Sequence, residues 1–388
     1  MSFIDKHTIQ SQIENFLPNN IKIKDTDNLL KLGLDSLKIF RLISLWRKEG
    51  SDVTFARLMK SPYLPNWINM IQESHIQKEK DTAIPSMNEP FELTDLQYAY
   101  WIGRRSDQLV GNVSCHAYME FDGNDIDIKK LEKAFSTIIQ HHPMLHIRIL
   151  EDGLQVVDSF QEYHIITHDL TTFSENQLDK ALLDIRNKLS HRKMDVEHGE
   201  VVSLQVSLLP QNKTRIHFES DGLVADVHSL FIILRDLEAA YARGSLPPAP
   251  INWNFAHYLK TINKKKEIAR KEDEIYWKKK IHEMPGAPAL PLCKQPEQVK
   301  NPRFFRRQFS LSPTEWKNLQ KYAANYGLTP AMVILTAYAL IISRWSSNDK
   351  FLINIPLFDR ETDFPGAEDA VADFSNLLLL AIDFSIPL

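Results

Sequence analysis

Two segments of the sequence combine residue types and spacing that could carry chemistry. In the first, Asp35 and Ser36 stand directly before a run of helical periodicity, so the serine lies at the start of a helix. A helix N-terminus favours a phosphate, and a serine hydroxyl there suits attachment of a phosphodiester-linked prosthetic arm. A plainer interpretation is that Asp35 and Ser36 only cap the helix.

The second segment is DGLVADVHSL at 221–230, in which Asp221 and Asp226 are five residues apart and Ser229 follows. This spacing across a loop lets two carboxylates line one cavity without forming a close like-charge pair, whose repulsion would raise one pKa. Without supporting motifs, two loop aspartates are usually solvated or cap a helix, so both interpretations stay open at this point.

The first segment belongs to a predicted helical unit, residues 1–75. A first helix has its apolar residues on one face, a second helix begins at Ser36 with Asp35 as N-cap, and a short helix follows. The apolar positions that define the three helices are Ile9, Ile13 and Phe16; Leu37, Phe40, Ile43 and Trp46; and Leu64, Trp67, Ile68 and Ile71. Residues 76–90 are polar and read as a linker.

From Phe91 the pattern becomes mixed α/β. The expected strands are 113–121, 201–209 and 214–219, and the expected helices are 128–138, 230–237 and 264–281. The apolar stretch 330–345 predicts a buried helix, and LLLLAIDFSIPL at 377–388 predicts a buried strand.

Composition removes several classes of function. The 388 residues are 43% hydrophobic and 25% charged, as in soluble proteins of two or three domains. A net charge of −4 offers no strong field for nucleic acid. No apolar run approaches the roughly 18 residues of a membrane span, and no signal peptide is present, so we expect a cytoplasmic protein. Cys115 and Cys293 lack metal-ligand spacing, so no metal is expected.

Gly33-Leu34-Asp35-Ser36-Leu37, at the start of the second helix of a unit of this length, resembles the carrier proteins of nonribosomal peptide synthetases. The resemblance implies a four-helix bundle in which Ser36 carries 4′-phosphopantetheine, added by a phosphopantetheinyl transferase. Aspartate before the serine, followed by KIFRLISLWRKEG, is similar to the aryl carriers of siderophore synthetases. Those carriers accept salicylate or 2,3-dihydroxybenzoate from a separate aryl-AMP ligase.

Seven further motifs, in order, resemble those of heterocyclisation domains, the cyclising relatives of condensation domains. The Asp-x4-Asp-x2-Ser pattern at 221–229 is the discriminating one, since ordinary condensation domains would place paired histidines at 221 and 222. The other matching segments are FELTDLQYAYWIGR at 91–104, HHPMLHIRILEDGLQ at 141–155, MPGAPALPL at 284–292, LTPAMVILTAYALIISRW at 328–345, INIPLFDR at 353–360 and ADFSNLLLL at 372–380.

This second resemblance implies a two-lobed α/β (α+β) fold like chloramphenicol acetyltransferase, with a tunnel where two carrier arms meet. An aminoacyl amine attacks the upstream acyl thioester, and the Cys, Ser or Thr side chain then closes a thiazoline or oxazoline with loss of water. Asp373 and Ser375 are expected near the cyclodehydration, with serine replacing the family's threonine. Asp226 is expected to pair with Arg360 across the lobes, and Asp221 to line the tunnel.

The resemblance also predicts the domain organisation: carrier 1–75, linker 76–90, N-terminal lobe 91–275 and C-terminal lobe 276–388. The family's last motifs follow the Asp-Phe-Thr segment, so a chain that stops at Leu388 implies an incomplete second lobe. Downstream adenylation and peptidyl carrier domains are the implied partners. An alternative is a carrier and docking protein whose cyclisation unit is catalytically incomplete. The sequence does not decide which aryl acid is loaded, nor whether cysteine, serine or threonine is the residue that is cyclised.

Overall fold

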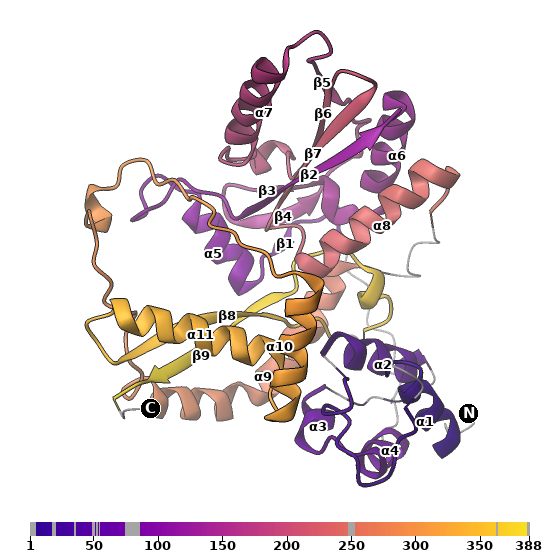
Figure 1. Cartoon of the computed structure of the whole chain (residues 1–388), viewed down its shortest axis with the longest axis vertical. Helices are drawn as coiled ribbons and strands as arrows, with labels where there is room; N and C mark the ends of the chain where they lie inside the picture. The colour runs from indigo at the N-terminus through magenta and orange to yellow at the C-terminus, as the bar shows by residue number, and fades with distance from the viewer. Residues whose placement is uncertain are drawn as a thin grey trace.

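The structure of the protein is a computed structural model. It describes residues 5–17, 21–34, 36–48, 51, 53, 55–73, 86–246, 253–361 and 364–385. Three parts follow one another along the chain: a small helical unit, a first lobe built on a four-stranded sheet, and a second lobe of long helices around a strand pair (Figure 1).

The helical unit contains α1 (Lys6–Glu14), α2 (Ser36–Lys48), α3 (Phe55–Lys60) and α4 (Leu64–Glu73). It has a hydrophobic core separate from that of the first lobe. Trp46 and Trp67 are fully buried at its centre, with edge-to-face rings 6.0 Å apart, and the Trp67 indole donates to the Leu58 carbonyl. The sequence predicted α1, α2 and α4. It missed α3 because six residues are too short for a clear helical period.

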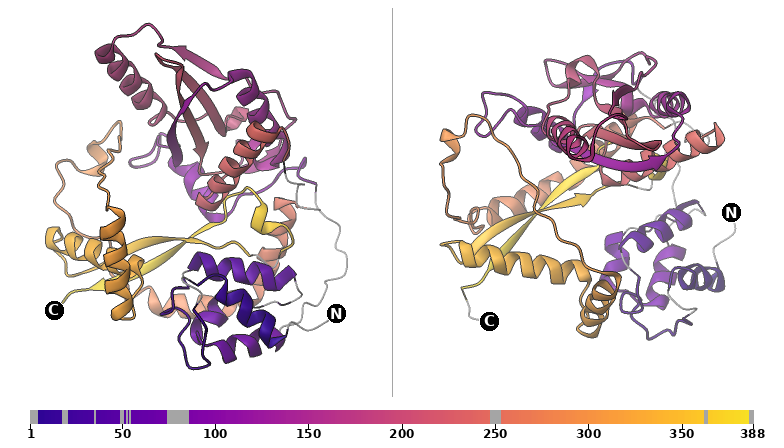
Figure 2. Two further views of the ribbon diagram at one scale, coloured as in Figure 1. Left: turned by 45° about the vertical axis from the view of Figure 1, so that its right-hand side comes forward. Right: turned by 45° about the horizontal axis from the view of Figure 1, so that its top comes forward.

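The sheet of the first lobe has the strand order β2-β7-β6-β5. Its strands are β2 (His116–Asn124), β5 (Ile166–Asp169), β6 (Val202–Leu208) and β7 (Lys213–Asp221). Only the β5–β6 pair is parallel. Helices α6 (Ile128–His141) and α8 (Val227–Arg243) pack on one face and α7 (Glu175–Leu189) covers the other (Figure 2). Central strand β6 is therefore buried along nearly its whole length.

A smaller sheet with the order β1-β4-β3 adjoins this lobe. It is made of β1 (Phe91–Glu92), β3 (Ile147–Ile149) and β4 (Leu154–Val157), with the short helices η2 (Pro143–His146) and η3 (Val196–His198) beside it. Helix α5 (Asp95–Gly103) follows β1 and begins with a capping box in which Thr94 and Gln97 satisfy each other's backbone N–H groups.

The second lobe contains α9 (Phe255–Lys280), η4 (Pro296–Gln298), α10 (Pro313–Asn325), α11 (Pro330–Trp345), β8 (Lys350–Phe358), η5 (Ala367–Asp369) and β9 (Ser375–Asp383). Strands β8 and β9 pair antiparallel along their whole lengths. Two segments tie this lobe to the core of the first: the start of α9, with Phe255 fully buried, and the stretch 370–374 before β9. The predicted lobe boundary between residues 275 and 276 falls inside α9.

Two expectations of burial were wrong. Helix α11 forms where the sequence predicted it, yet among its residues only Ala339 is buried, and Trp345 is 66% exposed. Strand β9 also forms, but its leucines are largely accessible. The physical reason is that β8 and β9 make a sheet of only two strands, which offers little surface to pack against.

Within the described residues, no single helix is long and apolar enough to cross a membrane. Helices α10 and α11 reach the required length and apolarity only when taken together, and they are bent by 94° at the break between them.

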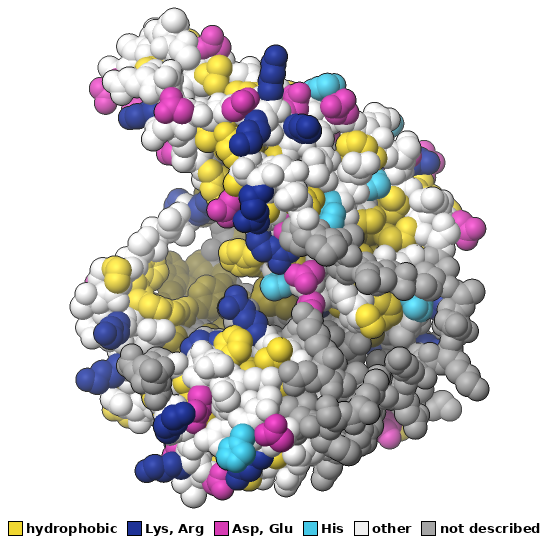
Figure 3. Space-filling view, turned by 90° about the vertical axis from the view of Figure 1, so that its right-hand side faces the viewer, with side chains coloured by type: hydrophobic (Ala, Val, Ile, Leu, Met, Phe, Trp, Pro, Cys, Tyr) yellow, Lys and Arg dark blue, Asp and Glu magenta, His cyan; other side chains and the backbone are white. Residues whose placement is uncertain are grey.

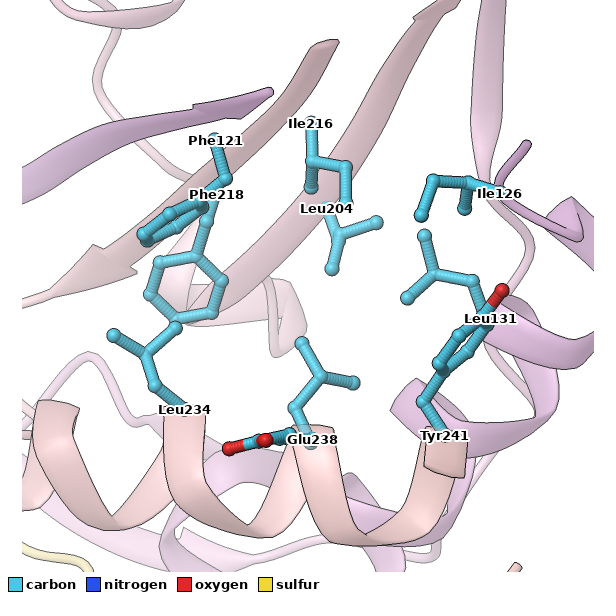
Figure 4. A pocket seen from close by; sticks show the side chains of 10 residues that line it. Phe121, Ile126, Leu131, Leu204, Ile216, Phe218, Leu234, Glu238 and Tyr241 are labelled. Atoms are coloured by element: carbon cyan, nitrogen blue, oxygen red, sulfur yellow. The ribbon is translucent and has the colours of Figure 1, made fainter. Parts of the chain in front are cut away.

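A pocket of about 180 Å³ lies inside the first lobe, between the four-stranded sheet and helices α6 and α8 (Figure 4). Its lining is almost wholly apolar, with the Glu238 carboxylate and the Tyr241 hydroxyl as the polar groups in view. None of the acidic residues singled out from the sequence lines it.

Candidate functional site

The residues predicted from the 221–229 and 353–375 motifs gather where the two lobes join. Asp226 is the N-cap of α8, and its carboxylate accepts from the backbone N–H of Ser229 at 2.6 Å. Arg360 follows β8 and donates from Nη2 to both Asp226 carboxylate oxygens, at 3.2 and 3.3 Å. The structure thus brings together two residues that are 134 positions apart, and both side chains are almost fully buried.

Arg360 is held by several other groups as well. Its Nη1 donates to the carbonyls of Ala367 and Ala370, its Nη2 donates to Ser229 Oγ at 3.0 Å, and the guanidinium lies 4.0 Å from the Phe374 ring centroid. Planar delocalised charge suits this combination of carbonyl, carboxylate and aromatic contacts. Arg360 therefore anchors the segment between β8 and β9 onto the start of α8.

Ser229 connects α8 directly to that segment. Its hydroxyl donates to the Ala372 carbonyl at 2.8 Å and accepts from the Ala372 N–H at 3.2 Å, and Asp226 N–H also donates to Ala372 O. These contacts place the next residue, Asp373, beside the junction. The third member of the Asp-x4-Asp-x2-Ser pattern is thus a positioning residue in this structure.

Asp221 ends β7 and is 1% exposed. Arg104, at the end of α5, forms an ion pair with its Oδ2, while Leu223 N–H donates to Oδ1. Burial raises the pKa of this carboxyl, and the Arg104 charge opposes that rise. Arg104 was not singled out from the sequence. Through these two contacts Asp221 fixes the loop after β7 against the end of α5.

Asp373 is also 1% exposed, but it lacks an ionic partner as close as that of Asp221 or Asp226. Its Oδ1 accepts from the Ser375 N–H at 3.0 Å, and its Oδ2 has no hydrogen-bond partner among the residues that the structure describes. Burial raises the pKa of this carboxyl to about 7. A pKa in this range allows the Asp373 carboxyl to exchange a proton near neutral pH.

Two residues that the sequence analysis did not select lie next to Asp373. Burial raises the pKa of the Tyr100 hydroxyl and of the Cys115 thiol, and the negative charge of Asp373 raises both further. Tyr100 comes from α5, while Cys115 precedes β2 and accepts from the Gly222 N–H at 2.7 Å through its carbonyl. The first matching motif, 91–104, contained Tyr100, but nothing in its local pattern indicated proximity to Asp373.

Figure 3 shows a hollow on the molecular surface between the two lobes, with hydrophobic side chains visible inside it. The residues around Asp373 come from both lobes: Tyr100 and Cys115 from the first, Arg360 and Ser375 from the second.

Ser36 is the first residue of α2, as the sequence predicted, and Asp35 lies outside the described residues. The loop before the helix is anchored by the buried Leu34, and the helix by the buried Ile39. Lys38 Nζ donates to the Gly33 carbonyl at 2.8 Å, which links the loop to the first turn. A serine at the first position of a 13-residue helix fits a phosphate-linked group, because unsatisfied N–H groups and the helix dipole favour negative charge there.

Comparison with known proteins places this geometry in a family. The condensation domain family matches residues 87–386. Pyochelin synthetase PchE from Pseudomonas aeruginosa is 36% identical over 367 residues, and phenyloxazoline synthase MbtB from Mycobacterium tuberculosis is 33% identical over 370 residues. Each alignment covers 92% of this chain, more than residues 87–386 represent, so both extend into the helical unit.

Among solved structures, the cyclization-docking bidomain of EpoB from Sorangium cellulosum superposes with a TM-score of 0.71 at 28% identity. That match covers 91% of this chain and 67% of the EpoB chain. The present chain spans about a quarter of the length of the curated relatives, 25% of PchE and 26% of MbtB. On the matched family, the relatives and the two-lobed geometry, the chain belongs to the condensation-domain family of nonribosomal peptide synthetases.

Proposed function

We propose that this chain loads an aryl acid on its helical unit and joins it to cysteine, serine or threonine in its two-lobed unit, with ring closure. The acid is salicylate or 2,3-dihydroxybenzoate, and the product is an aryl thiazoline or oxazoline of the kind used in siderophores. The names of the relatives support this class, since one is a pyochelin synthetase and another a phenyloxazoline synthase. The cyclization-docking structure of EpoB supports the ring-forming step.

The helical unit is the proposed aryl carrier, with Ser36 as the attachment site. When bound there, 4′-phosphopantetheine supplies a flexible arm with a terminal thiol that holds the acyl group. This chain supplies the serine, the helix N-terminus that favours the phosphate, and a loop fixed by Leu34. A phosphopantetheinyl transferase and an aryl-AMP ligase are the proposed loading partners.

Adenylation and peptidyl carrier domains adjacent to the condensation unit would present the second substrate. In the first reaction its amine attacks the acyl thioester carbonyl, so the C–S bond breaks and the carrier thiol leaves. In the second, the thiol or hydroxyl of its side chain adds to the new amide carbonyl, and one water is lost from that carbon. Orientation of both tethered substrates by the two lobes lowers the barrier by replacing a bimolecular encounter.

Asp373 is the proposed acid–base group for ring closure. The surroundings of its carboxyl are the main observation that supports this proposal. It is buried at the lobe junction, one carboxylate oxygen has no partner in the described part of the chain, and its pKa is about 7. Such a carboxyl can take a proton from the attacking side chain and return it to the departing hydroxyl. The backbone N–H of Ser375 donates to the Asp373 carboxylate. The Ser375 hydroxyl can act both as a hydrogen-bond donor and as an acceptor.

The experiment separates the two reactions. The chain is loaded with salicylate by a phosphopantetheinyl transferase and an aryl-AMP ligase, and a cysteine-loaded peptidyl carrier is then added. Intact-mass analysis distinguishes the linear amide from the ring, which is lighter by one water. We expect the wild-type chain to give the ring. Asp373→Asn and Ser375→Ala should slow ring closure by about a hundredfold or more, while amide formation changes little.

Ser375→Thr is the matched control, because it retains the hydroxyl, and it should keep ring formation within a few fold of wild type. Ser36→Ala should remain unloaded. Amide without ring in the wild-type chain would contradict the cyclisation assignment and leave an ordinary condensation domain. Loading without any amide would instead indicate a carrier and docking protein.

A further inference from the structure

A cluster of three potential metal ligands lies in the first lobe, outside the junction described above. His141 is the last residue of α6, His142 is its C-cap, and Asp236 projects from α8. Each offers one ligand atom, and these three atoms lie within 4.8 Å of one another. His142 and Asp236 are buried and His141 is half-buried, so one side of the cluster is open to solvent.

The two buried members already point at each other. His142 Nε2 lies 2.9 Å from Asp236 Oδ2, and the ring centroids of His141 and His142 are 4.7 Å apart at nearly right angles. In a tetrahedral zinc site, ligand atoms are roughly 3.4 Å apart, given Zn–N and Zn–O bonds of about 2.0–2.2 Å. The three ligand atoms of the cluster, all within 4.8 Å of one another, approach that spacing.

A second layer of contacts holds the carboxylate in place. Arg235 Nε donates to Asp236 Oδ1 at 2.8 Å, which leaves Oδ2 for the histidine side of the cluster. Arg235 Nη1 reaches Asp369 of η5 at 2.9 Å. Ligating carboxylates in metal sites are commonly oriented by such outer hydrogen bonds.

The chemistry of the donor set suits a transition-metal ion. Two imidazoles and one carboxylate, each with one ligand atom in the cluster, favour Zn²⁺ and neighbouring transition metals over Mg²⁺ or Ca²⁺.

We infer that His141, His142 and Asp236 form a binding site for one divalent transition-metal ion of the zinc class, with solvent completing the coordination. The ion clamps the C-terminus of α6 to the middle of α8. Asp236 is ten residues from the Asp226 cap, which is roughly 15 Å along the helix, and Arg235 links it to Asp369 in the segment that Arg360 anchors. It stabilises the first lobe and takes no part in the transfer of acyl groups.

The test uses the full chain after removal of metals by chelator dialysis. Zn²⁺ binding is measured by calorimetric titration, Co²⁺ is used as a visible-absorption probe of four-coordinate geometry, and Tm is recorded with and without Zn²⁺. We expect one ion per chain, Co²⁺ absorption of the tetrahedral type, and a Zn²⁺-dependent rise in Tm. His141→Ala should weaken binding at least tenfold and remove the Tm rise.

His141 is only half-buried, so its replacement leaves the fold intact and the comparison stays interpretable. His282→Ala, which removes an exposed histidine outside the cluster, is the matched control and should bind as the wild type does. Equal Zn²⁺ affinity in wild type and His141→Ala would overturn the inference, as would the absence of saturable binding by the wild-type chain.

Discussion

Arg360 Nη2 and Asp226 Oδ1 lie 3.2 Å apart in a buried contact that joins the segment after β8 to the N-terminus of α8. The same guanidinium satisfies the carbonyls of Ala367 and Ala370. One side chain therefore fixes the path of the chain on which Asp373 is carried. Its removal should affect both stability and the geometry of the junction.

Arg360→Met is expected to lower the free energy of unfolding by about 3–5 kcal/mol, because it leaves the Asp226 carboxylate buried without its cation. Urea unfolding measures the change. Arg148→Met is the control: Arg148 pairs with Asp158, both side chains are about half exposed, and the loss there should stay below about 1 kcal/mol. Equal losses of unfolding free energy in Arg360→Met and Arg148→Met would show that the buried ion pair stabilises the fold no more than the exposed one.

The Asp373 carboxyl predicts a pH dependence of stability. Its pKa is about 7 in the folded chain against 3.8 in an unfolded one, so the folded state retains the proton over that interval. The protonated carboxyl makes its full contribution to the free energy of unfolding below about pH 4. This contribution is lost as the pH rises to 7, by on the order of 1.4 kcal/mol per pH unit. Asp373→Asn should remove this decline. The unfolding free energies of the wild type and of Asp373→Asn are measured from pH 4 to 8. Parallel curves for the two proteins would contradict the raised pKa of Asp373.

His217 predicts the opposite slope. It is fully buried on β7, between Ser207 Oγ and the Tyr118 hydroxyl, each at 2.8 Å. Burial lowers its pKa to about 4, so the folded state disfavours the charged imidazole. Stability should be lost as the pH falls from about 6.5 to 4. His217→Gln should reduce this loss of stability at low pH, measured as the urea midpoint of unfolding against pH. His282→Gln, which replaces an exposed histidine, should leave that pH dependence unchanged.

Gly222 predicts a steric effect at the junction. A Cβ added there would lie 2.8 Å from the Cys115 carbonyl oxygen, which is backbone and cannot rotate away. Gly222→Ala should therefore lower the free energy of unfolding by about 1–3 kcal/mol and displace the neighbouring Asp221. Gly286→Ala, where the added Cβ meets nothing within 4 Å, is the control for thermal unfolding. Equal Tm values for Gly222→Ala and Gly286→Ala would argue against a close approach of Gly222 to the Cys115 carbonyl.

Among the described residues, local patterns predicted seven of the eleven α-helices and four of the nine strands, because an amphipathic period is a property of consecutive residues. Helix α8 and strands β6 and β7 lie close to their expected ranges, while β2 begins at His116 rather than at 113. Burial was predicted less well for α11 and β9, since it depends on which surfaces other segments provide. The same limit explains why Arg104 and Tyr100 were missed. Tyr100 lies in α5 and Arg104 is its C-cap, and the aspartates with which they interact are more than a hundred positions away in the sequence.

The sequence by itself determined the family, the acidic pattern at 221–229 and the position of Ser36 at the start of a helix, because these depend on the order of residues alone. Only the tertiary structure decided the roles within the pattern. Asp221 is paired with Arg104, Asp226 is paired with Arg360, and Asp373 has a carboxylate oxygen that meets no partner within the described ranges. Three aspartates of identical chemistry differ because desolvation and neighbouring charge are set by distant segments that folding brings together.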